Sequence, residues 1–451
     1  MGVDSKGSTP RALRGDPGER LAFSMDAIPL AERLCRVLAS LERPTAEWPA
    51  ENEWPALILR ARETKLAPLL YVRLQKRVDF ERVPAQVRQE LREAFLVSAG
   101  RQLLAERALC EALSVLGREK CSVVVLKGGY LAHAVFERPG ARPMGDLDLL
   151  VPFEKVAEAI AALGLAGWMP NGPCLLEDLR LVQDQAPQLL RADGSCLELH
   201  WDLVRPGSSV QADVAGLFTR SIPFEVAGRA ARGLCVEDLL LHLVVHDSVH
   251  HRFELGPRTL FDLAATLATH GARLDWPALA ERARLWGAPG ELFVFLSMAR
   301  DLAGAAVPEG VLELVLPEGM DEGIVRDVQG LVLAGPRPYA AVSDNVRRVF
   351  LEGSASSKLG LFMRRLFPSP REMAAFYGIP ARSPRMAVGY VRRVWDLTRA
   401  YGPEAMRLAS GRLAPGGEEH PVDVSVKQAD RLLARLRTCA MARNGKGRDD
   451  C

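Results

Sequence analysis

Two short apolar runs interrupt a sequence whose remaining pattern is mostly helical. Ser122–Leu126 is rich in valine and is followed by Gly128-Gly129, and Asp146–Val151 alternates acidic and apolar side chains before it becomes wholly apolar. Short β-branched runs bounded by glycine predict strands. The chain must therefore combine a sheet with helices, which limits it to the mixed fold classes.

Further elements surround these two strands. Tyr130–Phe136 fits a short helix, and Phe153–Leu163 has the apolar spacing of an amphipathic one. Two more apolar runs flank Asp193-Gly194, a dipeptide typical of a β-hairpin. Strands and helices that mix in this way predict a small α/β unit.

Helical patterns dominate on both sides of this unit. Leucine and valine recur at helical spacing before it, and again from Val236 onward. We therefore expect an α+β fold, with a small mixed sheet between two helical regions. The expected divisions are a disordered lead at 1–25, an N-terminal helical region at 26–118, a core at 119–230, a C-terminal helical domain at 231–400 and a flexible basic tail at 401–451.

Composition excludes several classes of protein. The net charge of +2 is too small for a protein that is basic throughout, and no apolar run reaches the roughly 18 residues of a membrane span. The N-terminal residues lack the apolar core of a signal peptide. The eight cysteines include no C-x-x-C pair, so we expect reduced thiols in a cytoplasmic protein.

Asp146 and Asp148 are the most informative residues of the second strand. Side chains alternate along a strand, so both carboxylates lie on one face while Leu147 and Leu149 lie on the other. Two close carboxylates repel each other unless a proton or a cation intervenes. A hard divalent cation, Mg²⁺ or Mn²⁺, resolves this repulsion. The alternative is a strand end whose acids are simply solvated.

Lys127-Gly128-Gly129 stands between the first strand and the helix that follows. Glycines allow backbone N–H groups to approach an anion, and a helix N-terminus favours negative charge. Lys127 adds a positive charge for a phosphate. The spacing is not that of a Walker loop. The pattern predicts a phosphate-binding turn, and the alternative is an ordinary tight turn.

The second hairpin strand supplies a third acid. Glu198, His200 and Asp202 share one face of it. If this strand pairs beside Asp146–Val151, Glu198 lies next to the aspartates. The alternative is a polar stripe that faces solvent.

Together these motifs resemble a known family. The segments LKGGYLAHAVF, RPMGDLDLLV and LELHW, followed by LLLHLVVHDSVHH and LFDLA, are similar over residues 30–400 to a bacterial nucleotidyltransferase family usually listed as uncharacterised. That family belongs to the DNA polymerase β-like superfamily. The resemblance implies a polymerase β-like core, and two Mg²⁺ ions held by Asp146, Asp148 and Glu198. The superfamily's usual Gly-Ser is Gly128-Gly129 here, so the hydroxyl that contacts the phosphates is missing.

The expected function follows from this resemblance. It is the metal-dependent transfer of a nucleoside monophosphate from an NTP to a hydroxyl of a small molecule, a protein or RNA. Lys127 and Arg142 neutralise developing charge, and His200 orients the acceptor or hydrogen-bonds Glu198. The missing hydroxyl leaves an alternative, a non-catalytic nucleotide-binding or scaffold protein that retains the fold.

Four histidines cluster downstream. His242, His246 and His250 follow one helical face, and His251 is adjacent. Collinear imidazoles do not readily surround one zinc ion, and only Asp262 is available to complete an HD phosphohydrolase pattern. We expect a helical wall that closes over the nucleotide or the acceptor.

Basic and aromatic residues interleave near the C-terminus. Residues 345–412 carry 13 lysines and arginines against four acids. Such a stretch most often is a solvated helix face, and the alternatives are nucleic-acid binding, an anionic membrane surface or an acidic partner.

Overall fold

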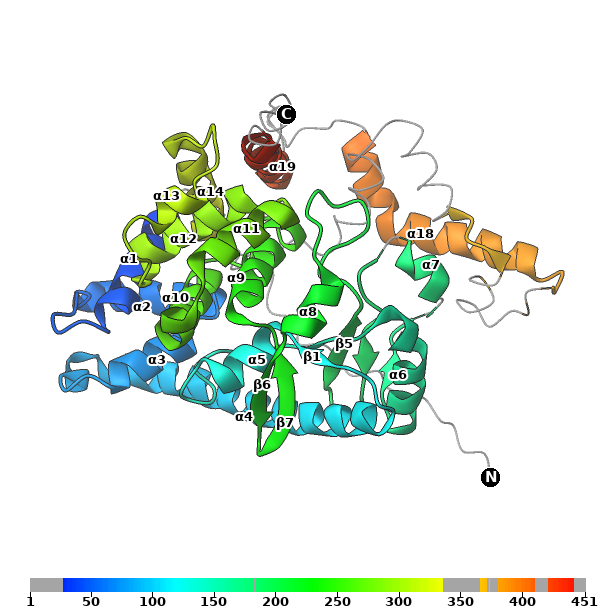
Figure 1. The fold of residues 1–451 in the computed structure, drawn as a ribbon, viewed down its shortest axis with the longest axis horizontal. Coiled ribbons are helices and arrows are strands. Elements are labelled where there is room, and N and C mark those ends of the chain that lie inside the picture. Colours follow the sequence, from blue (N-terminus) through cyan, green and yellow to red (C-terminus); the bar gives the residue numbers. More distant parts are fainter. Residues whose placement is uncertain are drawn as a thin grey trace.

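The computed structural model is an α+β fold in which helices surround one mixed sheet (Figure 1), as the sequence predicted. The structure describes residues 27–335, apart from 173, 175 and 182, and then 366–370, 373, 380, 382–409 and 421–441. The disordered lead predicted at 1–25 and much of the basic stretch at 345–412 lie outside the described residues. None of the described helices is both long and apolar enough to cross a membrane.

In the described part of the chain, seven strands form one sheet in the order β3-β4-β5-β2-β1-β7-β6. Their bounds are β1 Val124–Val125, β2 Leu147–Leu150, β3 Met169–Pro170, β4 Leu189–Leu190, β5 Cys196–His200, β6 Ile222–Val226 and β7 Arg229–Gly233. β2 pairs in parallel with β5 and β1 pairs in parallel with β7, whereas the other neighbours are antiparallel. The sheet therefore continues beyond residue 230, where the sequence placed the end of the core.

The predicted hairpin at Asp193-Gly194 is confirmed as β4 and β5. Leu190 lies opposite Cys196, and Gly194 has a φ of 83°, which the turn requires and which glycine adopts without steric cost. β5 then runs back into the centre of the sheet beside β2.

Helices precede, accompany and follow the sheet. The first group is α1 Ala27–Ser40, α2 Trp54–Glu63, α3 Ala67–Gln75 and α4 Ala85–Arg118. The second is α5 Lys127–Ala134, α6 Phe153–Leu165, α7 Leu176–Arg180 and α8 Val214–Arg220. The third is α9 Val236–Val245, the π-helix η3 His246–His250, α10 Arg258–His270, α11 Trp276–Trp286, α12 Pro289–Ala303, α13 Val311–Val315, α14 Glu322–Ala334, α18 Met386–Ala409 and α19 Pro421–Met441.

The two faces of the sheet have different neighbours. Leu147 and Leu149 of β2 and Leu199 of β5 share a core with Leu109 and Ala112 of α4, the long helix along the lower side of the molecule in Figure 1. The alternate residues of β2 and β5 point the other way, toward α9 and α10. This alternation is the one predicted from the sequence, and it places the polar side chains between the sheet and the C-terminal helices.

The N-terminal and C-terminal helices pack on each other, although they are far apart in the chain. α1 contacts α12 and α14, and Leu34 and Leu38 of α1 share one core with Phe295 of α12 and Val332 of α14. The two predicted helical regions therefore meet in one hydrophobic core that also reaches the sheet at Leu150.

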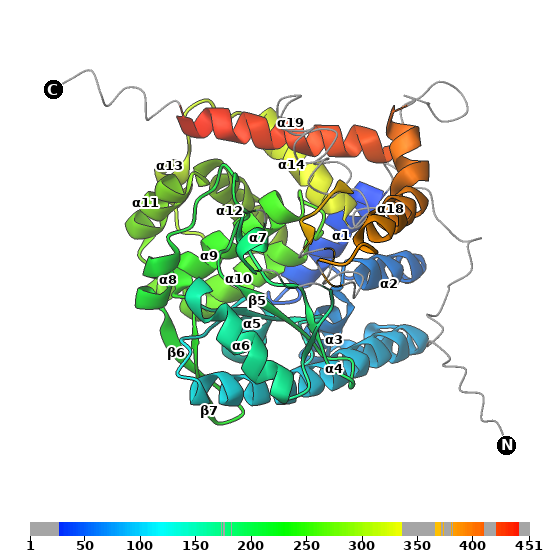
Figure 2. The ribbon, with the colours of Figure 1, turned by 90° about the vertical axis from the view of Figure 1, so that its right-hand side faces the viewer.

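The C-terminal region differs from the predicted flexible tail at 401–451. Residues 421–441 form α19, which contacts α12 and α14 and lies across the top of the molecule in Figure 2. Leu432, Leu433 and Leu436 are buried against this helical core. Their spacing is that of an apolar helix face. The prediction of a flexible tail missed this helix because glycine and basic residues flank it on both sides.

Candidate active site

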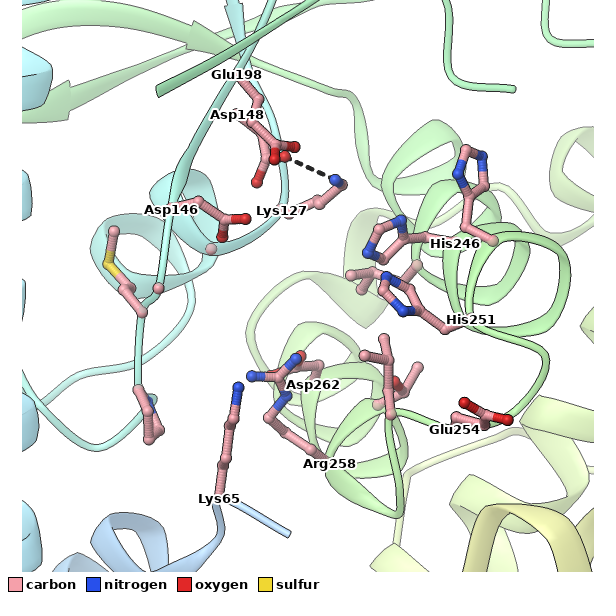
Figure 3. A pocket seen from close by; sticks show the side chains of 18 of the residues that line it. Lys65, Lys127, Asp146, Asp148, Glu198, His246, His251, Glu254, Arg258 and Asp262 are labelled. Carbon is pink, nitrogen blue, oxygen red and sulfur yellow. Dashed lines mark hydrogen bonds and ion pairs between the residues drawn. The ribbon is translucent and has the colours of Figure 1, made fainter. Parts of the chain in front are cut away.

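A cavity of about 630 Å³ opens between the polar face of the sheet and the segment from α9 to α10 (Figure 3). One wall carries Asp146, Asp148 and Glu198, and the opposite wall carries His246 and His251. Lys65, from the turn between α2 and α3, and Arg258, the first residue of α10, complete the lower rim in this view. The N-terminal helical region, the sheet region and the C-terminal helices therefore all contribute residues to this cavity.

The parallel pairing of β2 with β5 builds the acidic wall. It places Asp148 directly beside Glu198, as expected if these strands were neighbours. Both side chains are buried, at 3% and 9% exposure. His200 is buried two residues further along β5, and its Nε2 lies 3.1 Å from Asp148 Oδ1 and 3.5 Å from Glu198 Oε2. Asp148, Glu198 and His200 each offer one ligand atom, and these atoms lie within 4.8 Å of one another.

Asp146 lies at the same cavity but outside this group of three. It directly precedes β2, and its carboxylate faces the cavity below Asp148 in Figure 3. Partial burial, and the negative charges of Asp148 and Glu198, raise the pKa of Asp146. The expected trio of acids therefore faces one cavity, with Asp146 nearer the solvent.

Lys127 contacts a carboxylate, whereas the sequence suggested a phosphate. Its Nζ lies 2.6 Å from Asp148 Oδ1. Burial opposes the charged forms of both groups, but the ion pair raises the pKa of Lys127 and, together with His200, holds the pKa of Asp148 well below its usual range. The positive charge of Lys127 therefore offsets the repulsion between the acids, which the sequence had suggested a metal ion would relieve.

The backbone at Lys127 has a φ of 41°, which is uncommon for a residue with a side chain. α5 begins at this residue, three positions before the predicted start at Tyr130. The N-cap residue, Leu126, makes no side-chain hydrogen bond to the first turn of α5. Its backbone N–H groups, with Lys127 and Gly128 at the cavity wall, are thus placed as donors for an anion.

Arg142 is tied to a helix of the C-terminal region. Its Nε and Nη2 donate to the two carboxylate oxygens of Asp262 in α10, at 2.8 and 2.9 Å, and both side chains are buried. Its remaining nitrogen, Nη1, lies over Gly128. Arg142 lines the cavity as expected, but much of its hydrogen-bonding capacity holds α10 against the loop that leads into β2.

Close packing explains the two glycines. A Cβ on Gly128 would lie 2.8 Å from Arg142 Nη1, and a Cβ on Gly129 would lie 2.7 Å from Val125 Cγ1. The Cβ direction of Gly129 is thus toward the strand, not into the cavity. The absence of serine there reflects packing in this chain and does not by itself argue against nucleotide binding.

We expect Gly128→Ala and Gly129→Ser each to lower the free energy of unfolding by about 1–3 kcal/mol, the usual cost of overpacking. Urea unfolding measures this change. The control is Gly117→Ala in α4, where a Cβ would meet nothing within 4 Å; it is expected to be neutral or to stabilise by up to about 1 kcal/mol. A neutral Gly129→Ser variant would show that packing does not require this glycine.

The histidines form a wall, as expected. The His242 and His246 rings are 5.9 Å apart and the His246 and His250 rings are 5.5 Å apart, in a helix that widens into the π-turn η3. His246, His250 and His251 line the cavity. Burial, and then the charge of Lys127, hold the pKa of His246 well below its ordinary value, so its imidazole is neutral.

The sequence did not reveal several residues of the cavity. Lys65 and Arg258 bring positive charge to it. Burial lowers the pKa of each, and so does repulsion, from Arg258 at Lys65 and from Arg142 at Arg258. Asp184 lies behind His200, and Asp202, expected on the acidic face, instead accepts hydrogen bonds from Leu203 N and Val204 N. No local pattern marks Lys65 or Arg258, because elements remote in sequence bring them to the cavity.

These features define an α+β protein with a buried acid–imidazole centre and a partly basic cavity. The family model described as an uncharacterised nucleotidyltransferase matches residues 50–304, more than half of the 451 residues. The chain belongs to this family of uncharacterised nucleotidyltransferases. The match is shorter than the resemblance expected over 30–400. No curated protein and no solved structure matches the chain.

Proposed function

We propose that this protein is a metal-dependent nucleotidyltransferase of the polymerase β-like superfamily. It would move a nucleoside monophosphate from an NTP to a hydroxyl of a small molecule, a protein or RNA. The observation that carries the proposal is the placement of Asp148 and Glu198 side by side on parallel strands, at the cavity where α5 begins. Family membership supports the same class of reaction.

The donor atoms fit a divalent cation. Two buried carboxylates and an imidazole converge within 4.8 Å, and carboxylate oxygens are the ligands that Mg²⁺ and Mn²⁺ prefer. Asp148 and Glu198 would hold the ion, with Asp146 at the open side. When bound, the ion would polarise phosphoryl oxygens and offset the charge that develops on them.

The chain's own groups then position the substrates. The N–H groups at the start of α5 suit a phosphate, and Lys65, Arg142 and Arg258 suit the negative charge of a triphosphate. The acceptor oxygen attacks the α-phosphorus, the bond to the β-phosphate oxygen breaks, and pyrophosphate leaves. Asp146 would accept the hydroxyl proton, since Lys127 and His200 hydrogen-bond Asp148 in the described structure and leave Asp146 at the open side.

One observation favours a second candidate. The Lys127 ammonium lies 2.6 Å from Asp148 and so supplies a positive charge where an ion would bind. A protein that binds nucleotides through this cavity without transferring them, a scaffold that retains the fold, would keep such a pair.

A nucleotide panel tests the two candidates. We expect at least one of ATP, CTP, GTP and UTP to raise the melting temperature in the presence of Mg²⁺ or Mn²⁺, because a ligand at 100 times its Kd stabilises by about 2.7 kcal/mol. Release of pyrophosphate with label transfer to a hydroxyl acceptor then identifies the enzyme. EDTA-treated protein is the control.

The outcomes separate clearly. Nucleotide binding with no transfer to small-molecule, protein or RNA acceptors favours the scaffold. A melting temperature that no nucleotide changes, with either metal ion, rejects both candidates.

A further inference from the structure

We propose that His200 is a nitrogen ligand of the metal ion, and that the centre therefore takes Mn²⁺, a first-row transition-metal ion, in preference to Mg²⁺. The inference rests on the metal-dependent function proposed above and deepens it. It concerns which atoms hold the ion, so it can be tested without an NTP or an acceptor.

The position of His200 supports this role. It follows Glu198 by two residues on β5, so both side chains project from the same face of the sheet. The imidazole is buried, and Nε2 points at the carboxylate oxygens of Asp148 and Glu198, 3.1 and 3.5 Å away. An ion held by these two acids would lie beside this nitrogen, since the three ligand atoms lie within 4.8 Å of one another.

A carboxylate on the far side of the ring provides an independent observation. Asp184 is 2% exposed, and its Oδ2 lies 3.9 Å from His200 Nδ1. No hydrogen bond reaches this oxygen within the part of the chain that the structure describes. A metal-binding histidine usually donates its second N–H to a carboxylate, which fixes the tautomer and the orientation of the ring. Asp184 Oδ2 is the carboxylate oxygen beside His200 Nδ1, and a small shift of the side chain would bring it within hydrogen-bond distance of that N–H.

The backbone holds Asp184 in this position. Trp201 N donates to Asp184 O at 2.9 Å, and Gln185 forms a β-bridge with His200. Arg205 Nε lies 3.5 Å from the other oxygen, Asp184 Oδ1. Asp184 is thus fixed relative to β5, with Oδ2 3.9 Å from His200 Nδ1 and also 3.9 Å from His250 Nδ1.

The donor set decides the kind of ion. Mg²⁺ strongly prefers oxygen ligands and an octahedral shell, whereas imidazole suits first-row transition ions. Mn²⁺ suits carboxylate ligands as Mg²⁺ does, and as a first-row transition ion it binds an imidazole nitrogen more readily than Mg²⁺ does. Two carboxylates and one imidazole therefore favour Mn²⁺ over Mg²⁺ at this centre.

Pulsed electron paramagnetic resonance of the full-length protein loaded with Mn²⁺ tests the proposal. We expect a ¹⁴N coupling from a directly bound imidazole, and Mn²⁺ binding that Mg²⁺ displaces only at a large excess. His200→Gln should abolish the coupling and most of the preference for Mn²⁺. Asp184→Asn should keep the coupling but weaken Mn²⁺ binding by roughly 10–100-fold, the usual effect of losing a carboxylate behind a ligand histidine.

His246→Gln is the matched control, because His246 lines the same cavity outside the group of three. It should keep the ¹⁴N coupling. Metal-free melting curves show whether each variant is folded. Wild-type protein that binds Mn²⁺ without a ¹⁴N coupling, or with the same affinity as Mg²⁺, overturns the inference. Nitrogen coordination without nucleotidyl transfer would reject the proposed function and leave this inference intact.

Discussion

Asp148→Asn is expected to lower nucleotidyl transfer by roughly 10³-fold or more, equivalent to about 4 kcal/mol of transition-state stabilisation. Asp148 is the central acid of the cavity, since it pairs with Glu198 across the strands and contacts both Lys127 and His200. An amide keeps the shape of the side chain but removes the charge that would hold a divalent ion. The rate of pyrophosphate release at saturating NTP measures the loss.

Two comparisons make this prediction specific. Glu198→Gln leaves the Lys127–Asp148 pair in place and should lower transfer by a similar factor, so it remains informative if Asp148→Asn is poorly folded. Asp327→Asn changes a half-exposed acid that pairs with Arg435 of α19, and it should leave the rate unchanged. An Asp148→Asn protein that binds a metal ion and transfers at the wild-type rate would contradict the assignment.

The second large effect concerns stability. Asp262→Ala is expected to lower the free energy of unfolding by about 3–5 kcal/mol, because it leaves the buried Arg142 guanidinium without its bidentate partner. The pair joins the loop before β2 to α10, so its loss also loosens the cavity. Urea unfolding followed by circular dichroism measures the change.

A double variant separates charge from packing. Arg142→Met with Asp262→Leu should recover much of the lost stability, because apolar residues of similar volume replace a buried ion pair at little cost. Asp301→Asn, in a pair with Arg300 whose side chains are about half exposed, is the control and should cost at most about 1 kcal/mol. A loss below about 1 kcal/mol for Asp262→Ala would show that solvent readily reaches Arg142.

Packing also changes how the Gly-Gly segment is interpreted. In the sequence, Gly129 stood where the superfamily has serine, and this favoured a scaffold. In the structure a Cβ at residue 129 would meet Val125, so a serine there would not face the cavity without a shift of the backbone. The stronger reason to keep the scaffold as a candidate is the contact between Lys127 and Asp148.

The alternation of polar and apolar residues was enough to predict much of the core. It identified β2, the hairpin of β4 and β5, and the shared face of Glu198 and His200, because side chains in a strand repeat every two residues. Turn chemistry at Asp193-Gly194 placed the hairpin. Helical spacing identified helices before and after the sheet, although it missed α19.

Tertiary packing alone decided what each polar group contacts. Arg142 and Asp262 are 120 residues apart, and Asp148 and His200 are 52 apart. No periodic signal connects such residues, because their contact depends on how strands pair and how α10 meets the loop before β2. The positions of Lys65 and Arg258 at the cavity, and of Asp184 beside His200, likewise follow only from tertiary packing. The local sequence pattern was therefore enough to predict the acids of the site. The ion pair between Lys127 and Asp148, and the position of Asp184 behind His200, are decided only by the packed fold.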